Sequence, residues 1–435
     1  MLFRSGGEYG SSLASASVNG HKEVVQILLE NGADVNMAGG EYGSALASAS
    51  VNGHKDVVQI LLRNRADVNM AGGEYGSALA SASAFGKKEV VQILLENGAD
   101  VNIGGGEYGS ALVSASIEGH KEVVQILLEN GADVNMAGGE YSGALVSASI
   151  RGHKEIVQIL LENGAEVNIV GGYHGSALAS ASAEGEEEVV QMLLEKGANV
   201  NMVGGEHGSA LASASANNKD EIVQILLENG AEVNMAGGYY GSALASASAE
   251  GQKEVVQILL ENGADVNMAG GYYGSALASA SAGGEKEVMQ ILLENGADVN
   301  MVGGYYGSAL ASASAEGEKE VLQILLENGA DVNMAGGYYG SPLGSASAEG
   351  ENEVVQILLE NGANVNSLGG GNQSSLILAL VNGHCETAQI LIDYEADACA
   401  LKRTYEAIVQ VLPEHGVGPD ERAAVDDTPM DITQY

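Results

Sequence analysis

Basic residues are scarce in this sequence. Its 435 residues include 18 lysines and arginines against 58 aspartates and glutamates, which gives a formal net charge of −40. Recognition of a phosphate backbone needs a stripe of basic side chains, so we expect no nucleic-acid partner. The acidic surface is compatible with a basic protein partner, and equally with a charge that only keeps the protein soluble.

Cysteines and long apolar segments are scarce as well. Only Cys385 and Cys399 occur, which allows one disulfide at most, so a reducing compartment fits best. The N-terminus lacks an apolar stretch of signal-peptide length, and no run approaches the roughly 18 apolar residues of a membrane-spanning helix. We therefore expect a cytoplasmic protein without a membrane partner.

The sequence also lacks a set of unlike functional groups that stands apart from its repeats. A catalytic site brings a nucleophile, a base and an orienting group to one place, whereas this chain distributes the same groups along a line. The Gly-Gly-Glu-Tyr-Gly-Ser segments lack the Lys-Ser/Thr pair that closes a phosphate-binding loop. One histidine per repeat, as at His21 and His54, sets the imidazoles roughly 10 Å apart, too far to share a zinc ion. We expect no enzymatic activity, no cofactor and no metal.

What the sequence does contain is a strict period of 33 residues. A leucine marks the same position in twelve consecutive units: Leu13, Leu46, Leu79, Leu112, Leu145, Leu178, Leu211, Leu244, Leu277, Leu310, Leu343 and Leu376. A period in this range is typical of a solenoid, in which each unit buries its apolar face only against its neighbours. We expect a gently curved rod roughly 100 Å long, with its function on an extended surface.

One unit, Ser242 to Gly274, shows the local plan. It opens with Ser-Ala-Leu-Ala-Ser-Ala-Ser-Ala, a short segment of small residues that favours a helix and close approach of neighbouring layers. After Gly251, residues Lys253 to Glu261 carry a broad apolar stripe at helical spacing. Gly263 is positioned to end this second helix in the left-handed conformation. The glycine-rich remainder predicts an extended hairpin, or finger, that leads to the next unit.

The stretch from Gly20 to Asn36, Gly-His-Lys-Glu-Val-Val-Gln-Ile-Leu-Leu-Glu-Asn-Gly-Ala-Asp-Val-Asn, resembles the most recognisable part of the ankyrin repeat. The resemblance covers about nine tenths of the chain and implies an all-α fold: an ankyrin-type α-solenoid of about twelve helix-turn-helix repeats with hairpin fingers. The chain departs from the family at its Thr-Pro-Leu-His opening, which here reads Ser-Ala-Leu-Ala. Ala47 and Ala80 therefore cannot make the hydrogen bonds of the family's histidine, and we expect a less rigidly held first helix.

The variant Gly-Gly-x-Tyr-Gly-Ser-Ala-Leu is similar to the ankyrin arrays of fungal signalling proteins that carry a NACHT-type nucleotide-switch domain. No such domain is present in these residues. The resemblance implies a sensor array that recognises a protein.

Substitutions between repeats concentrate at the turn after the first helix, as at Ala84-Phe85, and in the finger. Tyrosine and histidine are enriched in the finger, and tyrosine is common in protein interfaces because it offers a large contact area at little entropic cost. The candidate partner-binding residues are Glu41, Tyr42, Glu74, Tyr75, Glu107, Tyr108, Tyr173, Tyr239, Tyr240, Tyr272, Tyr273, Tyr305, Tyr306, Tyr338 and Tyr339. The alternative is that the second finger position, which is Tyr or His, only packs against the next finger. The first position, which changes between Glu and Tyr, is the better recognition candidate.

The ends and one defect complete the domain plan. We expect a partial finger of a preceding unit at 1–10, the repeat array at 11–406, a C-terminal capping helix region at 407–415 and an acidic disordered tail at 416–435. The N-terminal edge is uncapped, so we expect a monomer unless this edge pairs. Arg65 replaces the helix-ending glycine of the second repeat, which predicts a weak layer there.

From these features we expect a non-enzymatic scaffold that binds a protein on the concave side made of fingers and first helices. The competing interpretation is a passive spacer or spring without a specific ligand.

Overall fold

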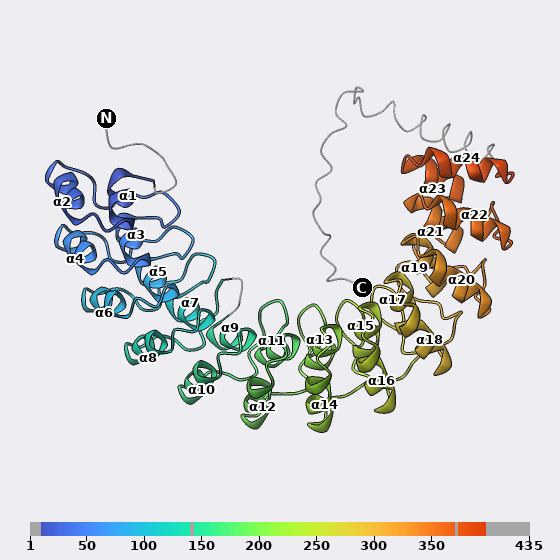
Figure 1. Ribbon diagram of the computed structural model, residues 1–435, viewed down its shortest axis with the longest axis horizontal. Coiled ribbons are helices and arrows are strands. Elements are labelled where there is room, and N and C mark those ends of the chain that lie inside the picture. The colour runs from blue at the N-terminus through green and yellow to red at the C-terminus, as the bar shows by residue number, and fades with distance from the viewer. Residues whose placement is uncertain (1–9, 140–142, 370–372, 397–435) are drawn as a thin grey trace, which may run out of the picture.

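The computed structural model describes residues 10–139, 143–369 and 373–396. Within these residues the chain forms 24 α-helices in consecutive pairs, and no β-strand. The first helix of each pair packs against the first helix of the next pair, and the second helix packs against the next second helix. Figure 1 shows the two layers as an arch, with the odd-numbered helices on the concave side and the even-numbered helices on the convex side. We call them inner and outer helices.

The inner helices are α1 (Ser12–Val18), α3 (Ala45–Val51), α5 (Ala78–Ala84), α7 (Ala111–Ile117), α9 (Ala144–Ile150), α11 (Ala177–Glu184), α13 (Ala210–Ala216), α15 (Ala243–Ala249), α17 (Ala276–Ala282), α19 (Ala309–Ala315), α21 (Pro342–Glu349) and α23 (Ser375–Val381). The outer helices are α2 (Lys22–Glu30), α4 (Lys55–Arg63), α6 (Lys88–Glu96), α8 (Lys121–Glu129), α10 (Lys154–Glu162), α12 (Glu187–Glu195), α14 (Asp220–Glu228), α16 (Lys253–Glu261), α18 (Lys286–Glu294), α20 (Lys319–Glu327), α22 (Asn352–Glu360) and α24 (Cys385–Asp393).

A serine starts almost every inner helix. In α3 the backbone N–H of Ala47 donates to Oγ of Ser44, at 3.1 Å, so the side chain satisfies an N–H group that has no partner within the helix. Among the inner helices, α9 is the exception, because the order Ser142-Gly143 is the reverse of the usual Gly-Ser and places a glycine at the cap. The first turn of α9 consequently has no side-chain cap.

The outer helices bury one apolar stripe, as the sequence predicts. In α16, Val255, Val256 and Leu259 are fully buried, whereas Glu254 and Gln257 are exposed. Gly263 follows this helix with a φ of 84°, which confirms the left-handed helix ending. Arg65 occupies the equivalent position after α4 with a φ of 66°, so the expected strained backbone is present in the second repeat.

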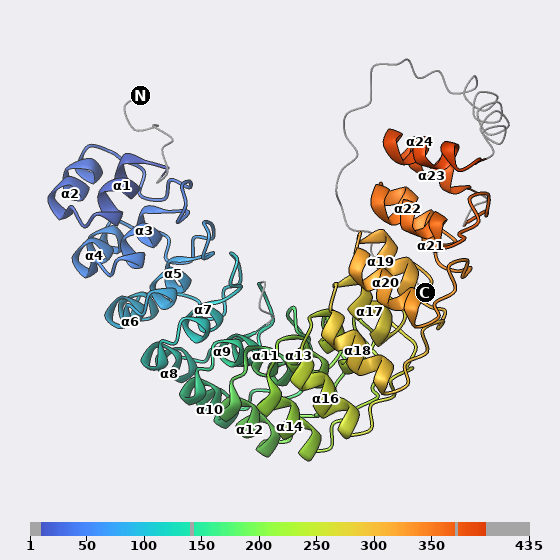
Figure 2. The same cartoon turned by 45° about the vertical axis from the view of Figure 1, so that its right-hand side comes forward.

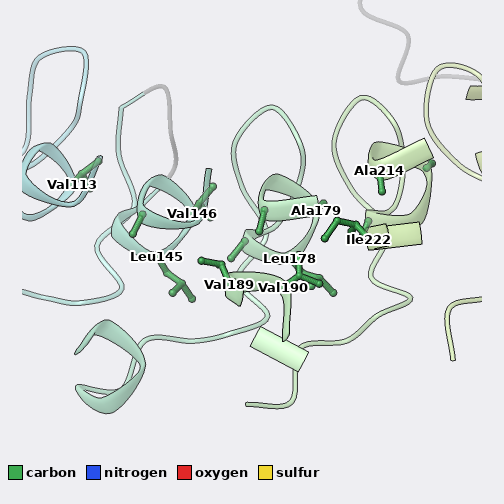
Figure 3. Packing of buried hydrophobic residues seen from close by; sticks show 14 of the residues in the cluster. Val113, Leu145, Val146, Leu178, Ala179, Val189, Val190, Ala214 and Ile222 are labelled. Atoms are coloured by element: carbon green, nitrogen blue, oxygen red, sulfur yellow. The ribbon is translucent and has the colours of Figure 1, made fainter. Parts of the chain in front are cut away.

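The main core is a continuous cluster of buried side chains that runs from Leu13 to Ala396. Figure 3 shows part of it, where Leu145 and Leu178 of successive inner helices pack near Val189 and Val190 of α12. Each repeat therefore contributes a thin layer to a shared core, and a single unit would have little to bury on its own.

Asparagines form a second connection between repeats in the loops that follow the outer helices. Asn36 donates from Nδ2 to the carbonyl oxygen of Arg65, at 3.2 Å, and its Oδ1 accepts from the backbone N–H of Asp67, at 2.7 Å. The same pair of bonds recurs in later repeats, for example from Asn267 to Gly296 and Asp298. One side chain thus fixes both the spacing and the orientation of two successive layers.

The array is more strongly curved than the gently curved rod expected from the sequence, as the two views show (Figures 1 and 2). The predicted capping helix at 407–415 and tail at 416–435 lie outside the described residues, as does most of the predicted partial finger at 1–10. In the described part of the chain, no helix is both long and apolar enough to cross a membrane.

Candidate functional site

The fingers line the inside of the arch and contact one another through their backbones. The N–H of Tyr272 donates to the carbonyl oxygen of Tyr239 at 2.7 Å, and Tyr305 donates to Tyr272 at 2.6 Å. Equivalent bonds join Glu74 to Glu41 and Glu107 to Glu74 in the first half of the array. Hydrogen-bonded strands lie about 4.7–4.9 Å apart, so the fingertips are stacked at a spacing close to that of a β-sheet.

The glycines of the finger are required by this close stacking. A Cβ atom at Gly274 would lie 2.2 Å from the carbonyl carbon of Gly303 in the next finger, and one at Gly271 would lie 2.1 Å from the carbonyl carbon of Tyr240. Both glycines also have positive φ values, 93° and 73°. The Gly-Gly-x-Tyr-Gly motif is thereby explained by backbone packing between repeats.

The first finger position forms what we call the first column: Tyr239, Tyr272, Tyr305 and Tyr338. Successive rings in this column are stacked with centroids 5.0, 5.1 and 5.2 Å apart. The two ends of the column are accessible, since Tyr239 is 38% exposed and Tyr338 is 63% exposed, whereas Tyr272 and Tyr305 between them are half-buried. In earlier repeats Glu41, Glu74 and Glu107 hold this position and are exposed, and Tyr173 is exposed too.

The second finger position forms the second column, which is aromatic wherever the structure describes it up to Tyr339. Its members are Tyr42, Tyr75, Tyr108, His174, His207, Tyr240, Tyr273, Tyr306 and Tyr339. Rings of consecutive described fingers are stacked with centroids between 5.5 Å (Tyr75 and Tyr108) and 6.4 Å (His207 and Tyr240). The finger that carries Glu140 and Tyr141 lies outside the described residues.

The second column packs onto the inner helices. Tyr306 is only 8% exposed and lies against Ala311 and Ala315 of α19. Ala311 stands where the ankyrin opening has its histidine, so the small residue leaves room for the tyrosine ring. The departure that predicted a loosely held first helix is therefore compensated by a ring from the neighbouring finger.

In several repeats the far end of the inner helix meets the second column as well. The hydroxyl of Tyr240 donates to Oε1 of Glu250 at 2.9 Å, and that of Tyr339 donates to Oε1 of Glu349 at 3.1 Å. In the third repeat Phe85 occupies this position and contacts the edge of Tyr75, with centroids 5.4 Å apart. The variable turn and the variable finger thus lie next to each other across the inner helix.

Burial changes the acid–base properties of this surface. It raises the pKa of Tyr240, Tyr273 and Tyr306 well above the ordinary tyrosine value, and nearby carboxylates add to the effect. It also raises the pKa of Glu316, where the hydrogen bond from Tyr306 acts in the opposite direction and Glu349 adds repulsion. In the second column, burial lowers the pKa of His174. Tyr240, Tyr273 and Tyr306 are therefore uncharged at neutral pH, with carboxylates beside them.

The recurrent histidines at the start of the outer helices have a structural role. Nε2 of His54 lies 3.0 Å from the carbonyl oxygen of Val18 in the preceding repeat, and His120, His153 and His384 make the same contact. In the eighth repeat Gln252 stands in place of the histidine, and its Nε2 donates to the carbonyl oxygen of Ala216. Across the described ranges, no three His, Cys, Asp or Glu side chains gather in a way that would hold a metal ion.

The sequence predicted the aromatic finger positions, but four structural features were missed. These are the stacking of the first column, the Glu250, Glu316 and Glu349 partners of the second column, the alanines against which the second column packs, and the missing cap of α9. The sequence did contain one signal for the glutamate partners. Each tyrosine is followed ten residues later by its glutamate, in the pairs Tyr240 and Glu250, Tyr306 and Glu316, and Tyr339 and Glu349.

Comparison with known families agrees with this architecture. The family model described as ankyrin repeats in three copies matches residues 6–72, 46–138, 112–204, 202–270, 270–336 and 336–402, which together cover most of the chain. No curated protein matches the sequence.

Proposed function

This chain belongs to the ankyrin-repeat family, and we propose that it is a non-enzymatic scaffold that binds a protein partner on its concave face of fingers and inner helices. Ankyrin repeats are in general protein–protein interaction modules. We place the candidate contact in the first column, flanked by the exposed parts of the second column and, in the earlier repeats, by Glu41, Glu74 and Glu107.

The observation that carries this proposal is the exposure of the first column, which is greatest at Tyr239 and Tyr338 and partial at Tyr272 and Tyr305. Packing accounts for Tyr306 of the second column, which is nearly buried, but it does not require Tyr338 to present 63% of its surface to solvent. Tyrosines that are already ordered lose little further entropy when a partner covers them. A pre-ordered row of four rings is therefore well suited to recognition.

The competing function is a passive spacer, which the near identity of the repeats supports. A spacer depends on length and stiffness alone. It would tolerate any change of the first column that leaves the array folded, whereas a binding scaffold would not.

The deciding experiment is affinity capture from the source organism's soluble extract. The test variant changes Tyr239, Tyr272, Tyr305 and Tyr338 to glutamate. Earlier repeats carry glutamate at this position and still form the backbone hydrogen bond between fingers, so the change is compatible with the fold. The matched control changes Gln257, Gln290, Gln323 and Gln356, which are exposed on the outer helices of the same part of the array, to glutamate.

Both variants add four negative charges. We expect the control to retain the captured protein and the tyrosine variant to lose it, with unchanged helicity in both. Equal capture by all three forms would favour the spacer or a partner bound elsewhere. A second variant with glutamine at the four tyrosine positions separates loss of the rings from added charge.

A narrower form of the proposal makes this array the sensor of a cytoplasmic signalling protein. Its support is the resemblance of the Gly-Gly-x-Tyr-Gly-Ser-Ala-Leu segments to fungal NACHT-linked arrays. The test is whether the captured partner changes nucleotide turnover by a NACHT-type protein that carries this array; no change would remove the signalling role and leave the scaffold.

A further inference from the structure

The concave face of the later repeats has no positive charge of its own. Between residues 231 and 349 the sequence contains three basic residues, Lys253, Lys286 and Lys319, and each stands at the start of an outer helix. Lys286 is paired with Glu320 at 2.7 Å, and Lys319 is paired with Glu353. The fingers and inner helices of this stretch therefore combine two tyrosine columns with acidic side chains and contain no lysine or arginine.

Acidic side chains lie beside the second column in three of its last four repeats, and Gly283 leaves a gap in the row beside Tyr273. Glu250, Glu316 and Glu349 each accept a tyrosine hydroxyl on Oε1, at 2.9, 3.4 and 3.1 Å. These bonds fix the orientation of the carboxylates before any ligand arrives. A carboxylate has about four acceptor directions, so each can still accept a hydrogen bond from a cationic partner.

The spacing of the second column matches an extended polypeptide. Its rings are 6.3, 6.2 and 6.3 Å apart from Tyr240 to Tyr339. An extended chain rises about 3.2–3.4 Å per residue, so its alternate side chains recur every 6.4–6.8 Å or so. A strand laid along the arch can therefore place every second side chain beside successive rings.

We propose that the concave face between Tyr239 and Glu349 binds an extended, arginine-rich segment of a partner protein. This inference rests on the proposed function and adds the chemistry of the partner. Alternate arginines lie over successive repeats, where a guanidinium meets the tyrosine hydroxyls and, beside Tyr240, Tyr306 and Tyr339, an oriented carboxylate. Arginine fits better than lysine because its planar group forms two parallel hydrogen bonds with a carboxylate.

The test measures binding of a fluorescent peptide with five Arg-Thr units to the full chain at about 0.15 M salt, where charges more than about 8 Å apart are largely screened. The inner variant carries Glu250→Gln, Glu316→Gln and Glu349→Gln, which keeps an acceptor for each tyrosine hydroxyl. The outer control carries Glu261→Gln, Glu294→Gln and Glu327→Gln, three exposed changes on the convex side. Both variants lose the same net charge.

We expect the inner variant to weaken binding by about tenfold or more, and the outer control by about twofold at most. A peptide with five Lys-Thr units should bind the unmodified chain more weakly than the arginine peptide. Equal weakening by the two variants would mean non-specific attraction to an acidic protein and would overturn the inference, as would absence of binding. If the arginine peptide result contradicts this inference but the tyrosine variant still loses the captured protein, the proposed scaffold function holds. If the tyrosine variant captures the protein normally, the proposed function is contradicted as well.

Discussion

The backbone N–H of Tyr305 donates a 2.6 Å hydrogen bond to the carbonyl oxygen of Tyr272, and the rings of these two residues stack with centroids 5.1 Å apart. The two tyrosines are 33 residues apart in the sequence. Their contact means that consecutive fingers touch at nearly the spacing of neighbouring strands in a sheet, about 4.8 Å.

This contact gives a physical reason for the shape of the array. Helices packed side by side need about 8–10 Å between their axes, roughly twice the spacing of the fingertips. Layers that are narrow at the finger and wide at the helices must curve toward the fingers. The arch in Figure 1 has its fingers on the concave side, in agreement with this reasoning.

Close finger packing makes Gly274 sensitive to substitution. Gly274→Ala places a Cβ atom 2.2 Å from the carbonyl carbon of Gly303, so we expect a loss of about 2–4 kcal/mol of unfolding free energy from backbone strain and overlap together. The control is Gly263→Ala, which has a similar positive φ of 84° and no atom within 4 Å of the new Cβ. It should cost about 1 kcal/mol. Urea denaturation of both variants measures the difference, and equal losses would contradict tight finger packing.

The strain at Arg65 should be reversible by one substitution. Arg65→Gly removes the left-handed arginine at φ 66° and should stabilise the second repeat by about 1 kcal/mol. Gly98→Arg introduces the same strain one repeat later, at a site where no atom lies within 4 Å of a new Cβ. Hydrogen exchange of α4 and α6 should show protection rising in the first variant and falling in the second. If α4 of the unmodified protein is as well protected as α10, the weak layer does not exist.

Alkaline pH should destabilise the array through the second column. Burial raises the pKa of Tyr240, Tyr273 and Tyr306 above the unfolded value of 10.0, so the unfolded chain releases its protons first as the pH rises. The stabilisation is complete below pH 10 and is lost progressively above it. Phenylalanine at these three positions should remove that part of the loss, as measured by circular dichroism between pH 8 and 11. A variant with the same alkaline transition as the unmodified chain would show that the columns do not cause it.

Acidic pH should destabilise the part of the second column around His174. Burial lowers the pKa of His174 below the ordinary 6.5, His207 lowers it further, and Glu184 acts in the opposite direction. The unfolded chain therefore binds the proton first, and this contribution to stability is present above pH 6.5 and is lost as the pH falls. Local hydrogen exchange in α11 at pH 7.5 and 5.5 measures it, with His174→Tyr as the variant expected to lose the response. A pH response that persists in this variant must come from other groups.

The sequence predicted the features that depend on residues close together in the chain. The two helices around Gly251 appear at Ala243–Ala249 and Lys253–Glu261, and the glycine after the second helix has the expected left-handed backbone. The stacking of the first column was not predicted, because its change between Glu and Tyr favoured recognition, and packing against the next finger was considered only for the second position. The packing of Tyr306 against Ala311 was also missed, because the alanine was interpreted only as the loss of a hydrogen bond and not as space for a ring.

The most direct test of the concave binding face is site-specific photo-crosslinking in the source organism's extract. A benzoylphenylalanine replaces Tyr305 on the concave side in one form and Gln323, exposed on α20, in the other. We expect position 305 to form a covalent adduct with one discrete protein, and position 323 to form none with that protein. An adduct from position 323 alone, or the same adducts from both positions, would contradict recognition by the concave face.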